Sequence, residues 1–580
     1  MKNRIASIRD SIRTALVSFS LGEKIIFGVL SATALFSAFL ILHTVDSYFL
    51  KEIPRHGGTF TEGVIGSPRY INPLLAFSDT DRDLVSLVYS GLLKAKPDGS
   101  LVGDLAQDYS ISDDGKTYTF NIKKDAVFQD GTPVTADDVI FTIQKAQDPA
   151  LKSPKRANWD GVKAEKVSDK TVKFTLKQPY APFIENTTLG ILPKHIWKDA
   201  SIDEFTFSQF NIEPIGSGPY KIGTVSRNTS GIPDSLTLQS FRKYTLNDPY
   251  IDSIVFKFYP NETALVDAYK KGTVTALHSV SGEVASELKL TSARIEQYPL
   301  PQTFAVYFNQ NVNPIFTHKE VRTVLNSIID RKALIDQVLH SFGTEATSPI
   351  PQGLTDLKPI EPTVTSIAYA QAILEKAGWK KNQDGIYELK SKTKTETLSF
   401  SISTGDAPEL KQAAEIIKKQ WEQLGARIDV KVFEMNDLNQ SVIRPRKYDS
   451  LFFGEIVGRD LDLYAFWHSS QRNDPGLNIA MYTNAKTDKI LEDARTISDE
   501  DTRLQKYGAF EKEIINDTPA VFAYSPDFVY VLPEEIKGFS FGKTITPSDR
   551  FSDIENWYIQ TDHVWNIFVP SYLKNKINKI

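Results

Sequence analysis

Residues 398–432 read LSFSISTGDAPELKQAAEIIKKQWEQLGARIDVKV and predict a strand, a helix and a second strand. Apolar and polar residues alternate from Leu398 to Ile402, which is typical of a half-buried strand. The helix that follows has an apolar stripe at helical spacing, made of Leu410, Ala413, Ala414, Ile417, Trp421 and Leu424. Gly425 ends the helix, and alternation returns at 428–432. Such a unit implies parallel neighbouring strands with a right-handed crossover, so we predict an α/β fold built on mixed sheets.

Local signals elsewhere in the chain support a mixed α and β architecture. The turn Asp113-Asp-Gly-Lys116 predicts a tight hairpin between two strands, because Asp-Gly supplies the positive φ that such turns need. Thr135-Ala-Asp-Asp138 and Thr317-His-Lys-Glu320 have the pattern of capping boxes, so we expect a helix to begin after each threonine.

The composition is that of a large folded protein. The chain has 580 residues, of which 41% are hydrophobic and 24% charged. This length allows about three or four domains, or two large lobes with subdomains. The net charge is −5 and no long basic stripe is present, which argues against a nucleic-acid partner. The chain has no cysteine, which excludes thiol nucleophiles, disulfides, thiolate metal sites and lipidation on cysteine.

The N-terminal region has the pattern of a membrane anchor. Ile25–Leu42 is uncharged and, as a helix, about 27 Å long, so we predict a single transmembrane helix at residues 25–45. Basic residues are enriched before this run, where they are Lys2, Arg4, Arg9, Arg13 and Lys24. The positive-inside rule therefore puts residues 1–24 in the cytoplasm and the large remainder outside. A cleaved signal peptide is the alternative, although no small-x-small cleavage site follows the run.

Common catalytic and metal-binding patterns are absent from the sequence. None of the eight histidines forms a local ligand pair, and no His-Glu-x-x-His or Gly-x-Ser-x-Gly motif occurs. The acidic run at 79–83 lacks the Gly and Glu of a calcium loop. The glycine-rich segment at 216–219 lacks the Lys and Ser or Thr of a phosphate loop. We therefore predict no catalytic residue, metal or cofactor, and we expect that the chain is not an enzyme.

A series of motifs resembles one family of bacterial binding proteins. The first two are GDLAQDYSISDDGKTYTF at 103–120 and FQDGTPVTADDV at 128–139. The others are PIGSGPYK at 214–221, VR at 321–322 with IDRKAL at 329–334, AGW at 377–379, and DTP at 517–519 followed by FAY at 522–524. In this order and spacing they resemble the bacterial extracellular solute-binding protein family 5, which includes oligopeptide-, dipeptide- and nickel-binding proteins. The resemblance covers residues of about 57 to 560.

The resemblance implies a two-lobed clamp of the periplasmic-binding-protein type, with an extra subdomain in the first lobe. We expect a monomer whose lobes close on a buried ligand. The expected segments are a cytoplasmic basic segment (1–24), the transmembrane anchor (25–45), a linker (46–56), the first lobe (57–95 and 206–300), its extra subdomain (96–205), the second lobe (301–530), and a return to the first lobe with a tail (531–580).

The resemblance also implies candidate ligand contacts. Ser78, Asp79 and Thr80 match the segment of the first lobe that contacts the ligand backbone. The stretch 453–462 matches the segment that in peptide binders carries an aspartate for the α-amino group, but with Gly454 aligned a glycine, Gly458, occupies that position.

Neighbouring charges offer replacements for the missing aspartate. Asp460 or Glu455 can take over the amine, and Arg459 can instead hold a carboxylate through two parallel hydrogen bonds. Trp467 and Tyr524 are expected to line the pocket, and packing in a core is the alternative for Trp467.

Taken together, the residues and the resemblance predict the substrate-binding component of an ABC importer that captures oligopeptides or dipeptides outside the cytoplasmic membrane. Its expected partners are the peptide ligand, the permease subunits with their cytoplasmic ATPases, and the membrane itself. Within the same family, a nickel chelate or an oligosaccharide is the alternative ligand. A surface peptide chaperone or sensor without a transport role, and an extracytoplasmic hydrolase, are the alternatives from other classes.

Overall fold

The computed structural model describes residues 14, 17–291, 293–355, 357–358, 360–361, 364–459, 461–543, 545–565 and 568–569. The chain divides into two compact units. The anchor unit comprises Met1–His56 and Tyr558–Ile580, and the binding unit comprises Gly57–Trp557.

In the part of the anchor unit that the structure describes, a long helix is followed by a two-stranded ribbon. Helix α2 (Leu21–Phe49) contains a 21-residue stretch, Leu21–Ile41, with a mean hydropathy of 2.0 and side chains that are not covered by protein. This stretch is long and apolar enough to cross a membrane, and a signal sequence has the same properties. Strand β1 (Leu50–Arg55) follows α2 directly and pairs antiparallel with β23 (Gln560–Trp565).

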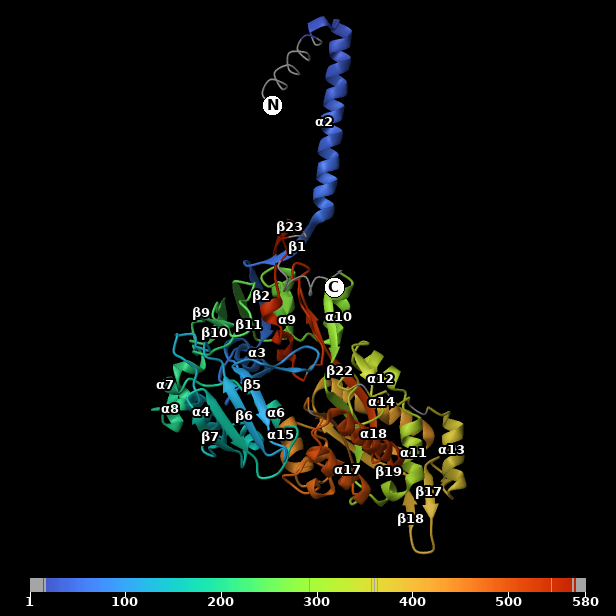
Figure 1. Ribbon diagram of the computed structural model, residues 1–580. Coiled ribbons are helices and arrows are strands. Elements are labelled where there is room, and N and C mark those ends of the chain that lie inside the picture. Colours follow the sequence, from blue (N-terminus) through green and yellow to red (C-terminus); the bar gives the residue numbers. More distant parts are fainter. Residues whose placement is uncertain are drawn as a thin grey trace. The chain divides into compact units, whose positions relative to one another are not determined.

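The binding unit is organised around strand β22, which joins two halves of a large sheet (Figure 1). The beginning of β22 (Ala520–Val531) pairs with β14 (Gln302–Phe308), and its end pairs with β13 (Ile295–Pro299) and β12 (Ala276–Leu277). We call the half on the β12 side lobe I and the half on the β14 side lobe II. The chain crosses between the lobes in the β13–β14 connection and along β22, so these two crossings are where a hinge motion has to occur.

The two lobes have different sheet orders. Beyond β12, lobe I continues with β2 (Thr59–Ile65), β11 (Ser253–Tyr259), β10 (Pro233–Ser240) and β9 (Tyr220–Arg227). Beyond β14, lobe II continues with β21 (Ser450–Ile456), β19 (Ser399–Gly405) and β20 (Arg427–Phe433), while β15 (Gly343–Glu345) pairs with β22.

Helices cover both faces of the lobe II sheet. One core lies under α11 (Lys319–Ser327), α12 (Arg331–Val338), α13 (Ile367–Lys376) and α14 (Pro408–Leu424). The second core lies under α16 (Tyr464–Trp467), α17 (Ala485–Thr496) and α18 (Glu500–Asp517). In lobe I, α9 (Glu262–Lys270) and α10 (Gly282–Lys289) pack against the end of β22, and α3 (Asp79–Val88) follows β2 in the chain.

A separate four-stranded sheet forms the extra subdomain of lobe I. Its strand order is β5 (Ala106–Ile111), β6 (Thr117–Ile122), β8 (Thr171–Thr175) and β7 (Lys163–Ser168). Helix α4 (Ala136–Gln147) packs on this sheet, and short helices α5 (Arg156–Trp159) and α6 (Phe183–Asn186) lie beside it. The hairpin β3 (Leu93–Ala95) and β4 (Leu101–Gly103) leads into it.

The strand–helix–strand unit predicted at 398–432 is confirmed. Strands β19 and β20 are parallel, and the helix between them buries all six residues of the predicted stripe. The indole N–H of Trp421 donates to the carbonyl oxygen of Leu325 at 2.9 Å, so the largest residue of the stripe is also satisfied in its hydrogen bonding. Gly425 has a φ of 107°, a left-handed conformation that favours glycine.

The local turn and cap predictions have mixed outcomes. The hairpin at Asp113–Lys116 is confirmed, with Gly115 at a φ of 66°. The capping box at Thr135 is confirmed, because the Asp138 carboxylate accepts from the Thr135 N–H at 2.8 Å. The box at Thr317 is wrong, since the Thr317 hydroxyl instead donates to the carbonyl oxygen of Pro314 at 2.7 Å.

Candidate functional site

The segment Ser78–Thr80 forms the start of helix α3. Ser78 is the N-cap, and its hydroxyl accepts from the N–H of Asp81 at 3.1 Å. Asp79 is exposed and pairs with Arg82 at 3.1 Å, whereas buried Thr80 donates to the carbonyl oxygen of Ile65 at 3.2 Å. These three residues line a cavity of about 230 Å³, together with Ile65, Gly66, Ser67, His278 and Ser279.

A buried charge cluster supports this part of lobe I. Arg550 is fully buried and donates two hydrogen bonds to the carboxylate of Asp83 on α3, at 2.7 and 2.8 Å, and one to Glu62 on β2. The Nε2 atom of His278 lies 3.6 Å from Asp83. Burial lowers the pKa of His278 to about 4, so this imidazole is neutral at pH 7. Through these hydrogen bonds the cluster connects α3, β2 and the chain at residue 550.

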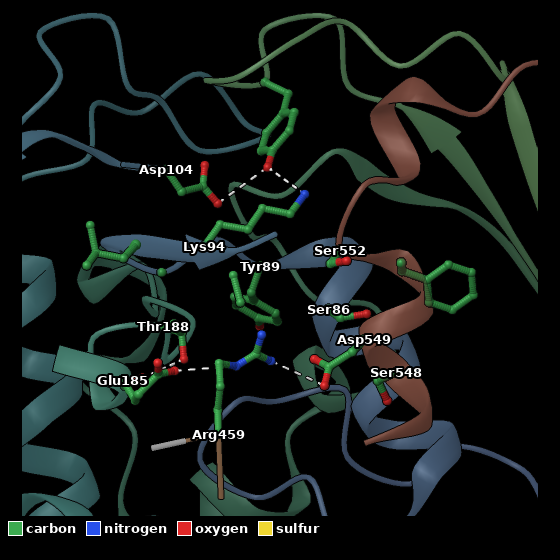
Figure 2. Close-up of a pocket in the computed structure, with 15 residues that line it drawn as sticks. Ser86, Tyr89, Lys94, Asp104, Glu185, Thr188, Arg459, Ser548, Asp549 and Ser552 are labelled. Atoms are coloured by element: carbon green, nitrogen blue, oxygen red, sulfur yellow. Dashed lines mark hydrogen bonds and ion pairs between the residues drawn. The ribbon is translucent and has the colours of Figure 1, made fainter. Parts of the chain in front are cut away.

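Arg459 extends from lobe II into lobe I (Figure 2). Its Nε atom lies 3.5 Å from Oε2 of Glu185, which belongs to α6 beside the extra subdomain. Its Nη2 atom lies 3.3 Å from Oδ2 of Asp549, next to Arg550 in the buried cluster. Only 12% of the Arg459 side chain is exposed. The guanidinium therefore bridges the two lobes in the closed arrangement.

The bridge lies in a polar cavity of about 180 Å³. Tyr89, Ser86 and Thr188 line it near the guanidinium, and Lys94 and Asp104 line its far side (Figure 2). The lining contains both cations and carboxylates at the closed lobe junction. Such a junction can pair with either charged terminus of a zwitterion, because acceptors for an ammonium and a donor for a carboxylate lie side by side.

A second contact joins lobe II to the extra subdomain. The Oδ2 atom of Asp462 accepts from Nε of Arg495 at 3.0 Å and from the hydroxyl of Tyr180 at 3.1 Å. The N–H of Ala181 donates to the carbonyl oxygen of Arg495 at 3.0 Å, and the guanidinium lies 4.2 Å from the ring centre of Tyr464. A groove of about 680 Å³ borders this contact. Closure is thus fixed at two places along the lobe junction.

Glu455 is a buried carboxyl on β21. Its polar neighbours are the indole of Trp467 and the hydroxyl of Tyr307. Burial raises the pKa of Glu455 well above its usual value, because desolvation disfavours the charged form of the carboxyl. This burial disfavours the negative charge that would attract the ammonium group of a ligand.

The two predicted aromatic contacts lie in the cores of lobe II. Trp467 is fully buried in the core under α16 to α18. Tyr524 is buried on the opposite face of the sheet, with its ring centre 5.1 Å from that of Phe304. Both side chains therefore lie in core environments, which for Trp467 was the alternative. Asp460 lies outside the described residues.

The structure adds four charged or polar residues that the sequence did not point to. Glu185 and Asp549 hold Arg459, while Tyr180 and Arg495 meet at Asp462. No local pattern marks any of them, because each acquires its role only when segments far apart in the chain come together. Asp549, as the N3 residue of a capping box with Thr546, carries a local signal for a turn but not for the bridge.

The comparison with protein families identifies the chain. The model for bacterial extracellular solute-binding proteins, family 5, matches residues 100–487. The chain belongs to this family. The solute-binding protein is 28% identical over 517 residues to the oligopeptide-binding protein AppA of Bacillus subtilis, an alignment covering 87% of this chain and 92% of that protein.

Solved structures share the two-lobed α/β fold. AppA of Bacillus subtilis in complex with a nonapeptide has a TM-score of 0.66 at 27% identity, covering 88% of this chain and all of that one. The ABC transporter substrate-binding protein CtaP of Listeria monocytogenes has a TM-score of 0.73 at 27% identity, covering 87% and 100%. NikZ of Campylobacter jejuni in complex with Ni(L-His) has a TM-score of 0.67 at 25% identity, covering 86% and 99%. The predicted fold class and family are therefore confirmed for this solute-binding protein.

Proposed function

We propose that this solute-binding protein captures peptides between its closing lobes and delivers them to an ABC importer. The observation that supports the proposal is the bridge that Arg459 forms between the two lobes. The two-lobed fold around this bridge is similar to that of a relative solved in complex with a nonapeptide. The alignment with that relative extends over both lobes and the extra subdomain. The proposed role is binding rather than catalysis.

The charges at the bridge suit a zwitterionic ligand. A peptide carboxylate can replace Glu185 and Asp549 on the guanidinium of Arg459, because Arg presents parallel N–H donors that match a carboxylate. The two released carboxylates then become available to a ligand ammonium group. Because closure removes water from the junction, these interactions act at a lower effective dielectric than at the surface. Ser78, Asp79 and Thr80 form the wall of the smaller cavity in lobe I, where we propose that backbone groups of the peptide bind.

We further propose that α2 anchors the protein in the cytoplasmic membrane as a single span, with its N-terminus inside. Support comes from the apolar stretch Leu21–Ile41 and from the basic residues that precede residue 25. The binding unit, as a monomer, would then face the outside, where the permease subunits of the importer are accessible. A role in an ABC importer requires genes for permeases and ATPases beside the gene for this protein.

Calorimetry with a small set of peptides tests the proposed ligand chemistry. We expect a free peptide to bind the full-length protein, and amidation of its C-terminus to weaken binding about as much as Arg459→Ala does. A loss of about 1.5 to 3 kcal/mol is expected for either change, the scale of a hydrogen bond to a charged group. In the Arg459→Ala variant, amidation of the peptide should cause little further loss of binding free energy.

The amine end of the ligand is tested in the same way. N-acetylation should weaken binding to the original protein, and Asp460→Asn should reproduce that loss if Asp460 is the amine anchor. Wild-type affinity in both the Arg459 and the Asp460 variants would exclude this loop from the site. Binding of a nickel–histidine complex but of no peptide would favour the alternative suggested by NikZ. Among the described residues, no group of three or more His, Asp or Glu side chains is placed to hold a metal ion.

A further inference from the structure

The loop between α12 and β15 carries a side chain from lobe II into lobe I. Leu339, at the end of α12, packs against the lobe II core under α11 to α14. Phe342 belongs instead to the lobe I core, with buried side chains of α9, α10 and the end of β22, and only 6% of it is exposed. Ala346 is again part of a lobe II core. Between Leu339 and Ala346 the chain therefore enters lobe I and returns.

The backbone of this loop is shaped for the crossing. His340 and Ser341 have φ angles of 52° and 70°, in the left-handed region that residues other than glycine rarely adopt. The N–H of Phe342 donates to the carbonyl oxygen of Leu339 at 2.9 Å, and the N–H of Ser341 donates to that of Ile335 at 3.2 Å. The turn that leads out of α12 is thus tied to the helix by its own hydrogen bonds.

Lobe I and β22 approach the loop closely. A Cβ atom on Gly282, the first residue of α10, would lie 2.3 Å from the carbonyl oxygen of Leu339. A Cβ atom on Gly343 would lie 2.9 Å from the carbonyl oxygen of Ser525 on β22. Both contacts depend on glycine, because any side chain would push the two backbones apart. Figure 1 shows α10, the end of β22 and α12 next to one another.

The loop passes β22 on the edge opposite to the β13–β14 connection. The carbonyl oxygen of Pro526 accepts from the N–H of Leu300 in that connection at 3.0 Å, and the N–H of Asp527 donates to the carbonyl oxygen of Phe342 at 3.2 Å. Successive residues of a strand direct their hydrogen bonds to opposite edges. Because Gly343 pairs with Pro526, the residues Leu300, Pro526 and Gly343 lie side by side across the sheet, on a line about 10 Å long.

Contacts on both edges of β22 restrict how the lobes can move. A strand that is held on one edge can bend and can also twist about its own length. When both edges are held, bending about the line across the strand stays possible, because it moves neither edge away from β22. Twisting about β22 would instead pull Phe342 out of the lobe I core or separate β15 from β22.

We propose that Phe342 is a pivot of lobe closure. It stays in the lobe I core while the lobes open and close, and it confines their motion to a rotation about the line through Leu300, Pro526 and Gly343. The two walls of the cleft therefore return to the same register at each closure. This inference concerns the motion of the lobes and does not depend on which ligand they enclose.

Distances between the outer strands of the two lobes test the pivot. Because the chain has no cysteine, nitroxide labels can be attached to Thr224→Cys on β9 and Lys431→Cys on β20, both at exposed positions. Pulsed electron paramagnetic resonance on the full-length protein in detergent, without ligand, gives the distribution of their distance. Bending produces separate maxima for open and closed protein, whereas twisting widens each maximum.

The expected change is a loss of this restriction when the side chain is removed. Phe342→Ala should widen each maximum by about twofold or more, because the cavity releases the loop from lobe I. The matched control is Phe400→Ala, which removes a side chain that is 4% exposed in the lobe II core and should leave the widths unchanged. Equal widths in the two variants would overturn the inference.

A second variant tests the loop without emptying the core. Gly343→Ala introduces the contact with Ser525, so β15 should separate from β22 and the maxima should widen again. Its control is Gly508→Ala on α18, where the added Cβ meets only Leu357 at an ordinary 3.5 Å. Phe342→Leu, which keeps an apolar side chain in the lobe I core, should give nearly the original widths. Original widths in Gly343→Ala would refute the pivot, even where Phe342→Ala does not fold.

Discussion

Replacing Arg459 by Gln should shift the lobes toward the open state. The side chain makes ion pairs at 3.5 and 3.3 Å to Glu185 and Asp549, and the three side chains are 12%, 24% and 26% exposed. Exposed pairs contribute up to about 1 kcal/mol, and breaking a fully buried pair costs about 3 to 5 kcal/mol. Because these pairs lie between the two limits, we expect a loss of about 1 to 3 kcal/mol, or roughly 5- to 150-fold in the ratio of closed to open protein.

Single-molecule energy transfer measures this ratio directly. Dyes are attached to cysteines introduced at Val167 in the extra subdomain and Lys392 in lobe II, both of which are exposed. The control is Arg444→Gln, which removes the same charge from an exposed pair with Asp474 that lies entirely within lobe II. Arg459→Gln should lower the population of the high-transfer state in the absence of ligand, whereas the control should leave it unchanged. Equal closed populations in both variants would refute the argument that the bridge stabilises closure.

Two further predictions concern stability. Trp421→Ala should lower the free energy of unfolding by about 3 to 5 kcal/mol, because it leaves a cavity at a fully buried position. The control, Tyr369→Ala on the exposed face of α13, should change the free energy of unfolding by less than about 0.5 kcal/mol. Urea titration measures both values, and equal losses in the two variants would contradict the prediction. The pKa of His278 is depressed to about 4 beside Asp83 and Arg550, so the unfolded chain binds a proton that the folded protein does not as pH falls from about 6.5 to 4. The stability contributed by neutral His278 is thus fully present above pH 6.5 and decreases by up to about 3 kcal/mol toward pH 4. If the free energy of unfolding of a His278→Gln variant depended on pH in the same way as that of the original protein, this assignment would be contradicted.

The fold was predictable where its signals are local. The stripe that contains Trp421 repeats at helical spacing and faces one core, so periodicity alone was enough to predict the helix and its buried residues. The box at Thr317 failed because Pro314 starts a tighter turn that uses the threonine hydroxyl and leaves His318 as the N-cap. Ser78 begins α3, and Asp81 three residues later completes a capping box, a local signal that the sequence contains.

The site was predictable only in part, because its partners come from distant segments. The family resemblance pointed to Arg459, but nothing near it in the sequence indicates Glu185 or Asp549. The raised pKa of Glu455 depends on its burial beside Trp467 and Tyr307, and this burial is a tertiary property. Tyr524 illustrates the reverse problem, since a residue within a family motif has a core environment in this chain.

Native mass spectrometry of the full-length protein, released from detergent micelles in the spectrometer, tests peptide capture most directly. We expect the purified protein to carry bound species whose masses and fragments correspond to peptides, and Arg459→Ala to reduce their occupancy. A protein that carries no peptide after purification and binds none when peptides are added, or one that carries a nickel–histidine complex or an oligosaccharide, would contradict the proposed function.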